Sequence, residues 1–81
     1  MAKKQPHRLP ISTRAIIARI NRKLRSDDEV LKTARSASVE RDAGRYFILN
    51  TRANYISHVH QDLETLGREL GVLQDWETVA E

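Results

Sequence analysis

The sequence of 81 residues contains no cysteine, only three glycines and four aromatic residues of the Phe, Trp and Tyr types. Without cysteine, no disulfide can stabilise the fold, and the composition is compatible with a reducing compartment. A chain this short buries only about 60–65% of the surface that it exposes when unfolded. We therefore expect one domain with one modest core and a small free energy of unfolding.

Long apolar runs are also missing. The longest strongly apolar run is Tyr46–Leu49, and no stretch approaches the roughly 20 apolar residues of a membrane-spanning helix. The first eight residues are basic, but the apolar segment of a signal peptide does not follow them. The sequence therefore predicts a cytoplasmic protein with no membrane partner.

Acidic residues are absent from the first 25 positions, which carry eight bases, whereas residues 26–52 carry five bases and five acids. Residues 53–81 carry one base and six acids, so the three segments contribute +8, 0 and −5 to the net charge of +3. Such a gradient is informative about binding partners rather than about the fold.

The first helix is predicted to follow a flexible basic arm of residues 1–10. Ser12 is a suitable N-cap, and Ile11 and Ile16 have the spacing of a hydrophobic staple around it. The apolar residues that follow share one narrow arc of a helix, and bases occupy the rest of its circumference. These apolar residues are Ile16, Ile17, Ile20 and Leu24.

The segment Ser26–Glu29 has the pattern of a capping box, with serine at the cap and glutamate three residues later. It predicts a second, short helix that starts at Asp27 and ends near Ser36. Because neither glycine nor proline separates the two segments, one bent helix over residues 13–35 is an alternative.

A loop over residues 36–44 and a β-hairpin are predicted next. Residues 45–50 and 55–60 are rich in strand formers, and Asn54 can adopt the positive φ of a hairpin loop over residues 51–54. The first strand is apolar on both faces, so helices or a second subunit should cover both faces. We interpret Tyr46 and Tyr55 as ordinary strand residues rather than platforms for stacked bases.

Asp62 is a suitable N-cap for a last helix that ends at Gly71. Gly67 lies within its apolar stripe, so the helix should approach the sheet closely there. Trp76 is expected to fold back as a lid over the hairpin, although an interface anchor is an alternative. The residues expected to be buried are Leu63, Leu66, Leu70, Ile16, Ile20, Phe47 and Leu49.

The predicted fold is therefore α+β, a single small domain over residues 11–81 with the order α-α-β-β-α. Two strands alone form a marginal sheet. We therefore expect a homodimer that completes the sheet or covers its apolar face.

His58, His60 and Asp62 have the spacing of the start of a two-zinc hydrolase motif, but Leu63 stands where that motif requires another histidine. We interpret the histidines as exposed hairpin residues and Asp62 as a helix cap. Glycine-rich phosphate loops and a paired acid–base set are also missing from the sequence. We expect a protein that is not an enzyme and needs no metal or other cofactor.

The basic helix is the strongest indication of function, because cations without neighbouring acids attract a phosphate backbone. Asn21 and Arg25 are the candidates for reading base edges. The alternatives are a protein-interaction module, such as a small inhibitor or assembly factor that binds an acidic partner, and a merely solubilising face. The predicted nucleic-acid-binding residues are Arg14, Arg19, Arg22, Lys23, Arg25, Lys3, Lys4 and Arg8.

Overall fold

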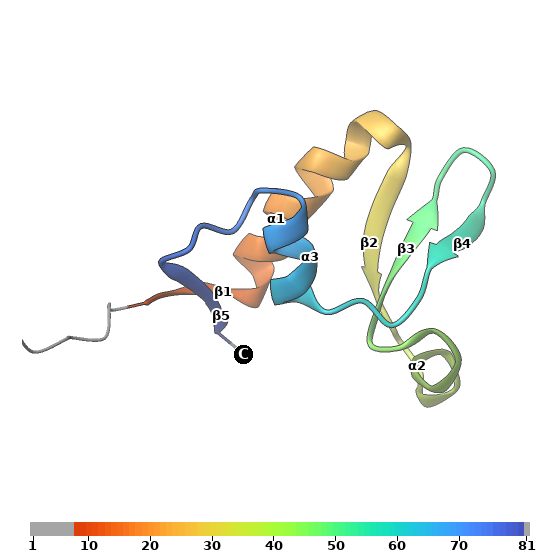
Figure 1. Cartoon of the computed structure of the whole chain (residues 1–81). Coiled ribbons are helices and arrows are strands. Elements are labelled where there is room, and N and C mark those ends of the chain that lie inside the picture. The colour runs from red at the N-terminus through yellow and green to blue at the C-terminus, as the bar shows by residue number, and fades with distance from the viewer. Residues whose placement is uncertain (1–7, 81) are drawn as a thin grey trace, which may run out of the picture.

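A computed structural model describes residues 8–80 and confirms the α+β class (Figure 1). Within this range, three α-helices and five strands follow one another in the order β-α-β-α-β-β-α-β, with one 3-10 turn after the first helix. The predicted hairpin is present, but the order contains more strands than the sequence indicated. The elements are β1 Leu9–Ser12, α1 Thr13–Leu24, η1 Arg25–Asp27, β2 Glu29–Thr33, α2 Ala37–Ala43, β3 Tyr46–Asn50, β4 Tyr55–His58, α3 Leu63–Glu69 and β5 Glu77–Ala80.

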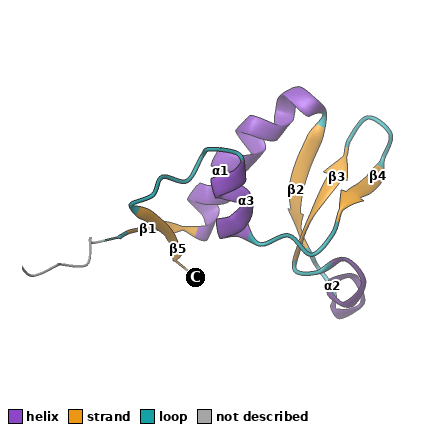
Figure 2. Ribbon diagram, in the orientation of Figure 1, coloured by secondary structure: helices purple, strands orange, loops and turns teal. Residues whose placement is uncertain are grey.

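Helices α1 and α3 pack side by side in the middle of the structure, between two separate sheets (Figure 2). The sheet with the order β2-β3-β4 is antiparallel, and the other sheet pairs β1 with β5 in parallel. The main core lies where α1, α3 and the three-stranded sheet meet. Within residues 8–80, no helix is both long enough and apolar enough to cross a membrane.

The two ends of the described chain form the small parallel sheet. Leu9 pairs with Glu77 and Ser12 with Ala80, so β1 begins inside the segment that was predicted to be a flexible arm. Residues 1–7, the rest of that arm, lie outside the described residues. The expectation that Trp76 covers the hairpin is wrong, because the residue is 57% exposed and its carbonyl accepts a hydrogen bond from Leu9 N, beside the small parallel sheet.

Helix α1 begins as the sequence predicts. The Ser12 hydroxyl accepts a hydrogen bond from Ala15 N at 3.1 Å, which satisfies one of the free amides of the first turn. Ile11 and Ile16 are both buried in the main core. Ile16 and Ile20 are fully buried, so the apolar stripe of this helix faces the interior as expected.

The predicted second helix after Ser26 does not form, and neither does one bent helix over residues 13–35. The chain leaves α1 through the 3-10 turn η1, and Asp28 takes a left-handed conformation (φ 58°) that reverses it into β2. The Ser26 hydroxyl donates to Lys23 O at 3.4 Å and caps no following helix. Pairing of β2 with β3, with the buried Leu31 opposite Ile48, outweighs the local resemblance to a capping box.

The predicted loop over residues 36–44 contains the short helix α2, which is a further correction. The Ser36 hydroxyl accepts a hydrogen bond from Val39 N, and Gly44, with φ 86° and ψ 172°, ends the helix. The helix has only seven residues, of which Ala43 alone is buried. It therefore has no apolar stripe from which it could be recognised.

The hairpin joins β3 to β4, and Asn54 has the expected positive φ (58°). The second strand ends at His58 rather than His60, which is left-handed itself (φ 53°). Tyr46 and Ile48 face the main core, and Phe47 is buried on the opposite face of the sheet. The β2 strand, whose Leu31 also lies in the main core, makes the sheet three-stranded rather than two-stranded.

Helix α3 begins at its predicted cap, because Asp62 Oδ2 accepts a hydrogen bond from Thr65 N at 2.9 Å. A methyl group added at Gly67 would lie 3.1 Å from Leu73 Cβ and 3.2 Å from Ile16 Cδ1. The close approach is therefore to α1 and to the segment after α3, and not to the sheet as expected. Leu63 and Leu66 are buried, as are Ile16, Ile20 and Phe47, whereas Leu70 and Leu49 are only partly buried.

Candidate nucleic-acid interface

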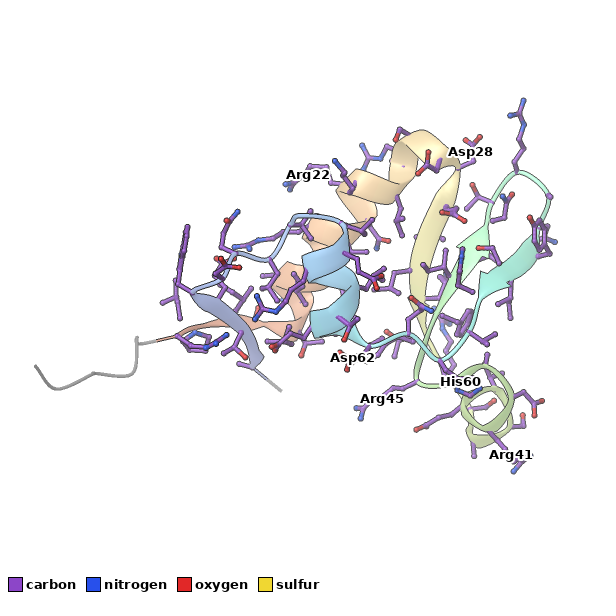
Figure 3. The ribbon with its side chains drawn as sticks, viewed as in Figure 1. Arg22, Asp28, Arg41, Arg45, His60 and Asp62 are labelled. Carbon is purple, nitrogen blue, oxygen red and sulfur yellow. The ribbon has the colours of Figure 1, made fainter. Side chains whose placement is uncertain are left out.

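The outer side of α1 and the first residue of η1 carry exposed cations. Arg14, Arg22 and Arg25 are exposed, and their spacing turns them away from the buried stripe of Ile16 and Ile20. At 1.5 Å per residue, the distance along the axis from Arg14 to Arg25 is about 16 Å. Figure 3 shows Arg22 on the outside of α1, above the segment that joins α3 to β5.

Lys23 is also exposed, on the flank of α1 next to Arg19. Within residues 8–80, the side chains of these four exposed cations make no ion pair or hydrogen bond. The helix itself contains no acidic residue. The resulting basic face consists of Arg14, Arg22, Lys23 and Arg25.

Arg19 has a different position from the other predicted cations. Its Nη1 donates to Glu77 Oε1 at 2.8 Å and to Val72 O at 3.0 Å, and its side chain is 33% exposed. The hydrogen bond to Glu77 raises the pKa of Arg19 and, together with the bond from Gln74 N, lowers the pKa of Glu77. Arg19 therefore joins α1 to the start of β5, and much of its charge is balanced internally.

A shallow hollow of about 490 Å³ lies between this flank of α1 and the segment before β5. Glu77 Oε1 accepts hydrogen bonds from both Arg19 Nη1 and Gln74 N, which holds the carboxylate at the edge of the hollow. This hollow could not be predicted from the sequence, because its two sides are distant in the chain, with 53 positions between Arg19 and Val72. Its lining residues are Arg19, Arg22, Lys23, Val72, Gln74 and Glu77.

The remaining predicted site residues do not join this face. Arg8 donates to Asp75 O at 3.3 Å, beside the parallel sheet. Lys3 and Lys4 lie outside the described residues. Asn21, one of the two residues predicted to contact base edges, accepts a 2.6 Å hydrogen bond from Leu31 N through its Oδ1. This bond links α1 to β2.

The acidic C-terminal region also has internal partners. Glu64 Oε1 accepts hydrogen bonds from Val79 N at 3.1 Å and Thr78 Oγ1 at 2.9 Å, and Glu64 Oε2 accepts one from Arg68 Nη2 at 3.1 Å. These bonds lower the pKa of Glu64 to about 2, with the backbone amide of Val79 contributing most. Glu64 and Glu77 thus hold β5 against the helices rather than forming a free acidic surface.

The three residues of the histidine motif, His58, His60 and Asp62, make separate contacts and do not form one site. His58 Nδ1 lies 3.3 Å from Ser57 Oγ, whose hydroxyl donates to Glu29 Oε2 at 2.9 Å. His60 packs closely against Gly44, and Asp62 caps α3. In the part of the chain that the structure describes, no group of three His, Asp or Glu side chains could hold a metal ion.

Comparisons of the chain with protein-family models, with curated proteins and with solved structures gave no match.

Proposed function

We propose that the protein is a small, non-enzymatic accessory or regulatory protein of the cytoplasm that contacts the phosphate backbone of a nucleic acid through α1. The single observation that carries this proposal is the basic face, where four exposed cations have no internal partner among residues 8–80. Unpaired cations along one helix can replace the counterions of a phosphate chain, and release of those counterions favours binding.

A titration followed by fluorescence anisotropy, with duplex DNA and single-stranded RNA at several salt concentrations, tests this proposal. Four phosphate contacts predict a slope of roughly −3.5 for log affinity against log salt on duplex DNA. Arg22→Gln should weaken binding to all sequences alike and flatten the slope by about one unit, because phosphate contacts carry no sequence information.

Arg41→Gln is the matched control. Arg41 is exposed on α2, which lies beyond the three-stranded sheet and far from Arg22 in Figure 3, so its loss should leave the slope unchanged. Absence of binding to either nucleic acid at low salt, with the protein folded by circular dichroism, would exclude this function. An acidic protein would then be the better candidate for the partner of the basic face.

A protein-interaction role for another surface is favoured by β4. Among residues 8–80, this strand pairs with β3 alone. Tyr55 and Ile56 are 53% and 42% exposed, and Val59, just beyond the end of the strand, is 45% exposed. The segment from Ala53 to Gln61 contains no Asp, Glu, Lys or Arg, the charged residues with which natural edge strands discourage pairing. We propose that two copies pair through this edge as a homodimer.

Multi-angle light scattering at micromolar concentrations tests the dimer. The chain mass is 9.3 kDa, so a dimer gives about twice this value. Ile56→Lys places a charge on the edge and should yield the monomer, whereas Arg52→Lys, in the exposed hairpin loop, should not. A monomer mass for the unaltered protein at high concentration would rule out the homodimer.

A further inference from the structure

The hollow beside α1 combines three kinds of group that one ligand can use together. Arg22 and Lys23 supply positive charge that no ion pair within residues 8–80 takes up. Val72 contributes apolar surface. Glu77 contributes a carboxylate that lines the hollow, with its side chain 8% exposed. Its Oε1 receives both of its hydrogen bonds in the described chain, and its Oε2 has no partner among residues 8–80.

The negative charge of Glu77 would oppose phosphate binding in this hollow if no cation balanced it. The ion pair with Arg19 offsets the negative charge of Glu77, so the hollow keeps an excess of positive charge from Arg22 and Lys23. The same ion pair and the bond from Gln74 N keep Glu77 ionised by lowering its pKa. An ionised carboxylate oxygen is a strong acceptor for a neutral hydroxyl donor.

We propose that this hollow binds one ribonucleotide unit of a single-stranded RNA. Arg22 and Lys23 bind the phosphate, Glu77 accepts a hydrogen bond from the ribose 2′-hydroxyl, and Val72 packs against the sugar. The 2′-hydroxyl is the group by which a protein distinguishes RNA from DNA at a given position. This inference rests on the proposed function, to which it adds the choice of RNA over DNA.

The test compares three single-stranded probes of ten uridine units that differ only at the 2′ position: ribose, 2′-deoxyribose and 2′-O-methylribose. The length, base and phosphate charge are the same in all three, and only the ribose probe has the hydroxyl donor. Binding to the unaltered protein is measured by fluorescence anisotropy at one fixed salt concentration. We expect the ribose probe to bind roughly fivefold more tightly than either of the other two.

Two variants test the phosphate-binding group and the hydroxyl acceptor of the hollow separately. Lys23→Gln should weaken binding of all three probes by a similar factor, because they share the phosphate. Glu77→Gln should narrow the preference for ribose, whereas Glu69→Gln, which removes an exposed acid on α3, should preserve it. Circular dichroism confirms folding of each variant, and the three-probe comparison on the unaltered protein stands without any variant.

The outcomes separate this inference from the proposed function. Equal affinity for the three probes would overturn the ribonucleotide site while leaving binding by the basic face intact. No affinity for any probe or for duplex DNA would overturn both. A preference for ribose that Glu77→Gln leaves unchanged would overturn the assignment of the ionised Glu77 carboxylate as the acceptor, because glutamine retains only a neutral acceptor oxygen.

Discussion

The side-chain oxygen of Asn21 lies 2.6 Å from the backbone nitrogen of Leu31, from which it accepts a hydrogen bond. This contact joins the last turn of α1 to β2, an edge strand of the three-stranded sheet. Leu31 is only 4% exposed, so water has little access to replace Asn21 as the partner of that amide. The bond thus fixes the position of the strand relative to the helix that carries the basic face.

Asn21→Ala should therefore destabilise the protein by about 1–3 kcal/mol, because it leaves a buried amide without an acceptor. Asn21→Asp retains an acceptor oxygen and should cost less. Urea unfolding followed by circular dichroism gives both values. Equal destabilisation by the two substitutions would show that the hydrogen bond is not what Asn21 contributes.

Leu66→Ala should reduce the free energy of unfolding by about 2–5 kcal/mol, because it removes a buried side chain from the interface of α3 with the core. This is enough to unfold a domain of marginal stability. The exposed Thr65 on the same helix provides a control, since Thr65→Ser keeps its hydroxyl and should have little effect. An unchanged melting temperature for Leu66→Ala would contradict the docking of α3.

Two glycines that both have positive φ should respond very differently to alanine. A Cβ at Gly44 would lie 2.7 Å from His60 Cα, and its φ of 86° and ψ of 172° belong to a region that is essentially restricted to glycine. A Cβ at Gly71 would meet no atom within 4 Å. We expect Gly44→Ala to cost at least about 3 kcal/mol and Gly71→Ala only about 1–2 kcal/mol, as measured by thermal unfolding. The reverse order would show that α2 and the residues after β4 do not meet as described.

The free energy of unfolding should decrease as the pH is lowered from about 4.5 to about 2, because Glu64 becomes protonated over this range. Its pKa is lowered in the folded state, so its contribution is fully present above pH 4.5 and is lost as the pH falls toward 2. Glu77, whose pKa is also lowered, contributes in the same direction. When unfolding is measured across this pH range, the free energy of unfolding should depend less steeply on pH for Glu64→Gln than for Glu69→Gln. Identical profiles would mean that Glu64 does not hold β5 in solution.

The elements that the sequence predicts correctly are those with strong local signals. Ser12 and Asp62 cap their helices, and Asn54 takes the positive φ of the hairpin loop. The segments that it predicts wrongly lack such signals or carry misleading ones. Strand β2 has a single buried residue, Leu31, and follows an apparent capping box, so its conformation depends on pairing with β3.

Less of the candidate site than of the fold can be predicted from the sequence. The exposed cations Arg14, Arg22 and Arg25 follow from helical spacing alone. The pairing of Arg19 with Glu77 cannot be predicted in this way, because 58 positions separate the two residues. In the sequence, each of them has the pattern of an ordinary surface charge. The sequence likewise indicates that Asn21 can contact bases. Only the position of β2 shows that its side-chain oxygen accepts a hydrogen bond from Leu31 N instead.

The parallel pairing of β1 with β5 also has a consequence for the order of events during synthesis. Thr13, just after β1, bonds to Ala80, 67 positions later. At roughly 5–20 residues per second, β1 therefore waits about 3–13 s on the ribosome before its partner strand exists. Until then the N-terminal strand has an open edge, and Arg19 lacks its carboxylate, so the surface between α1 and β5 is the last part of the molecule to be completed.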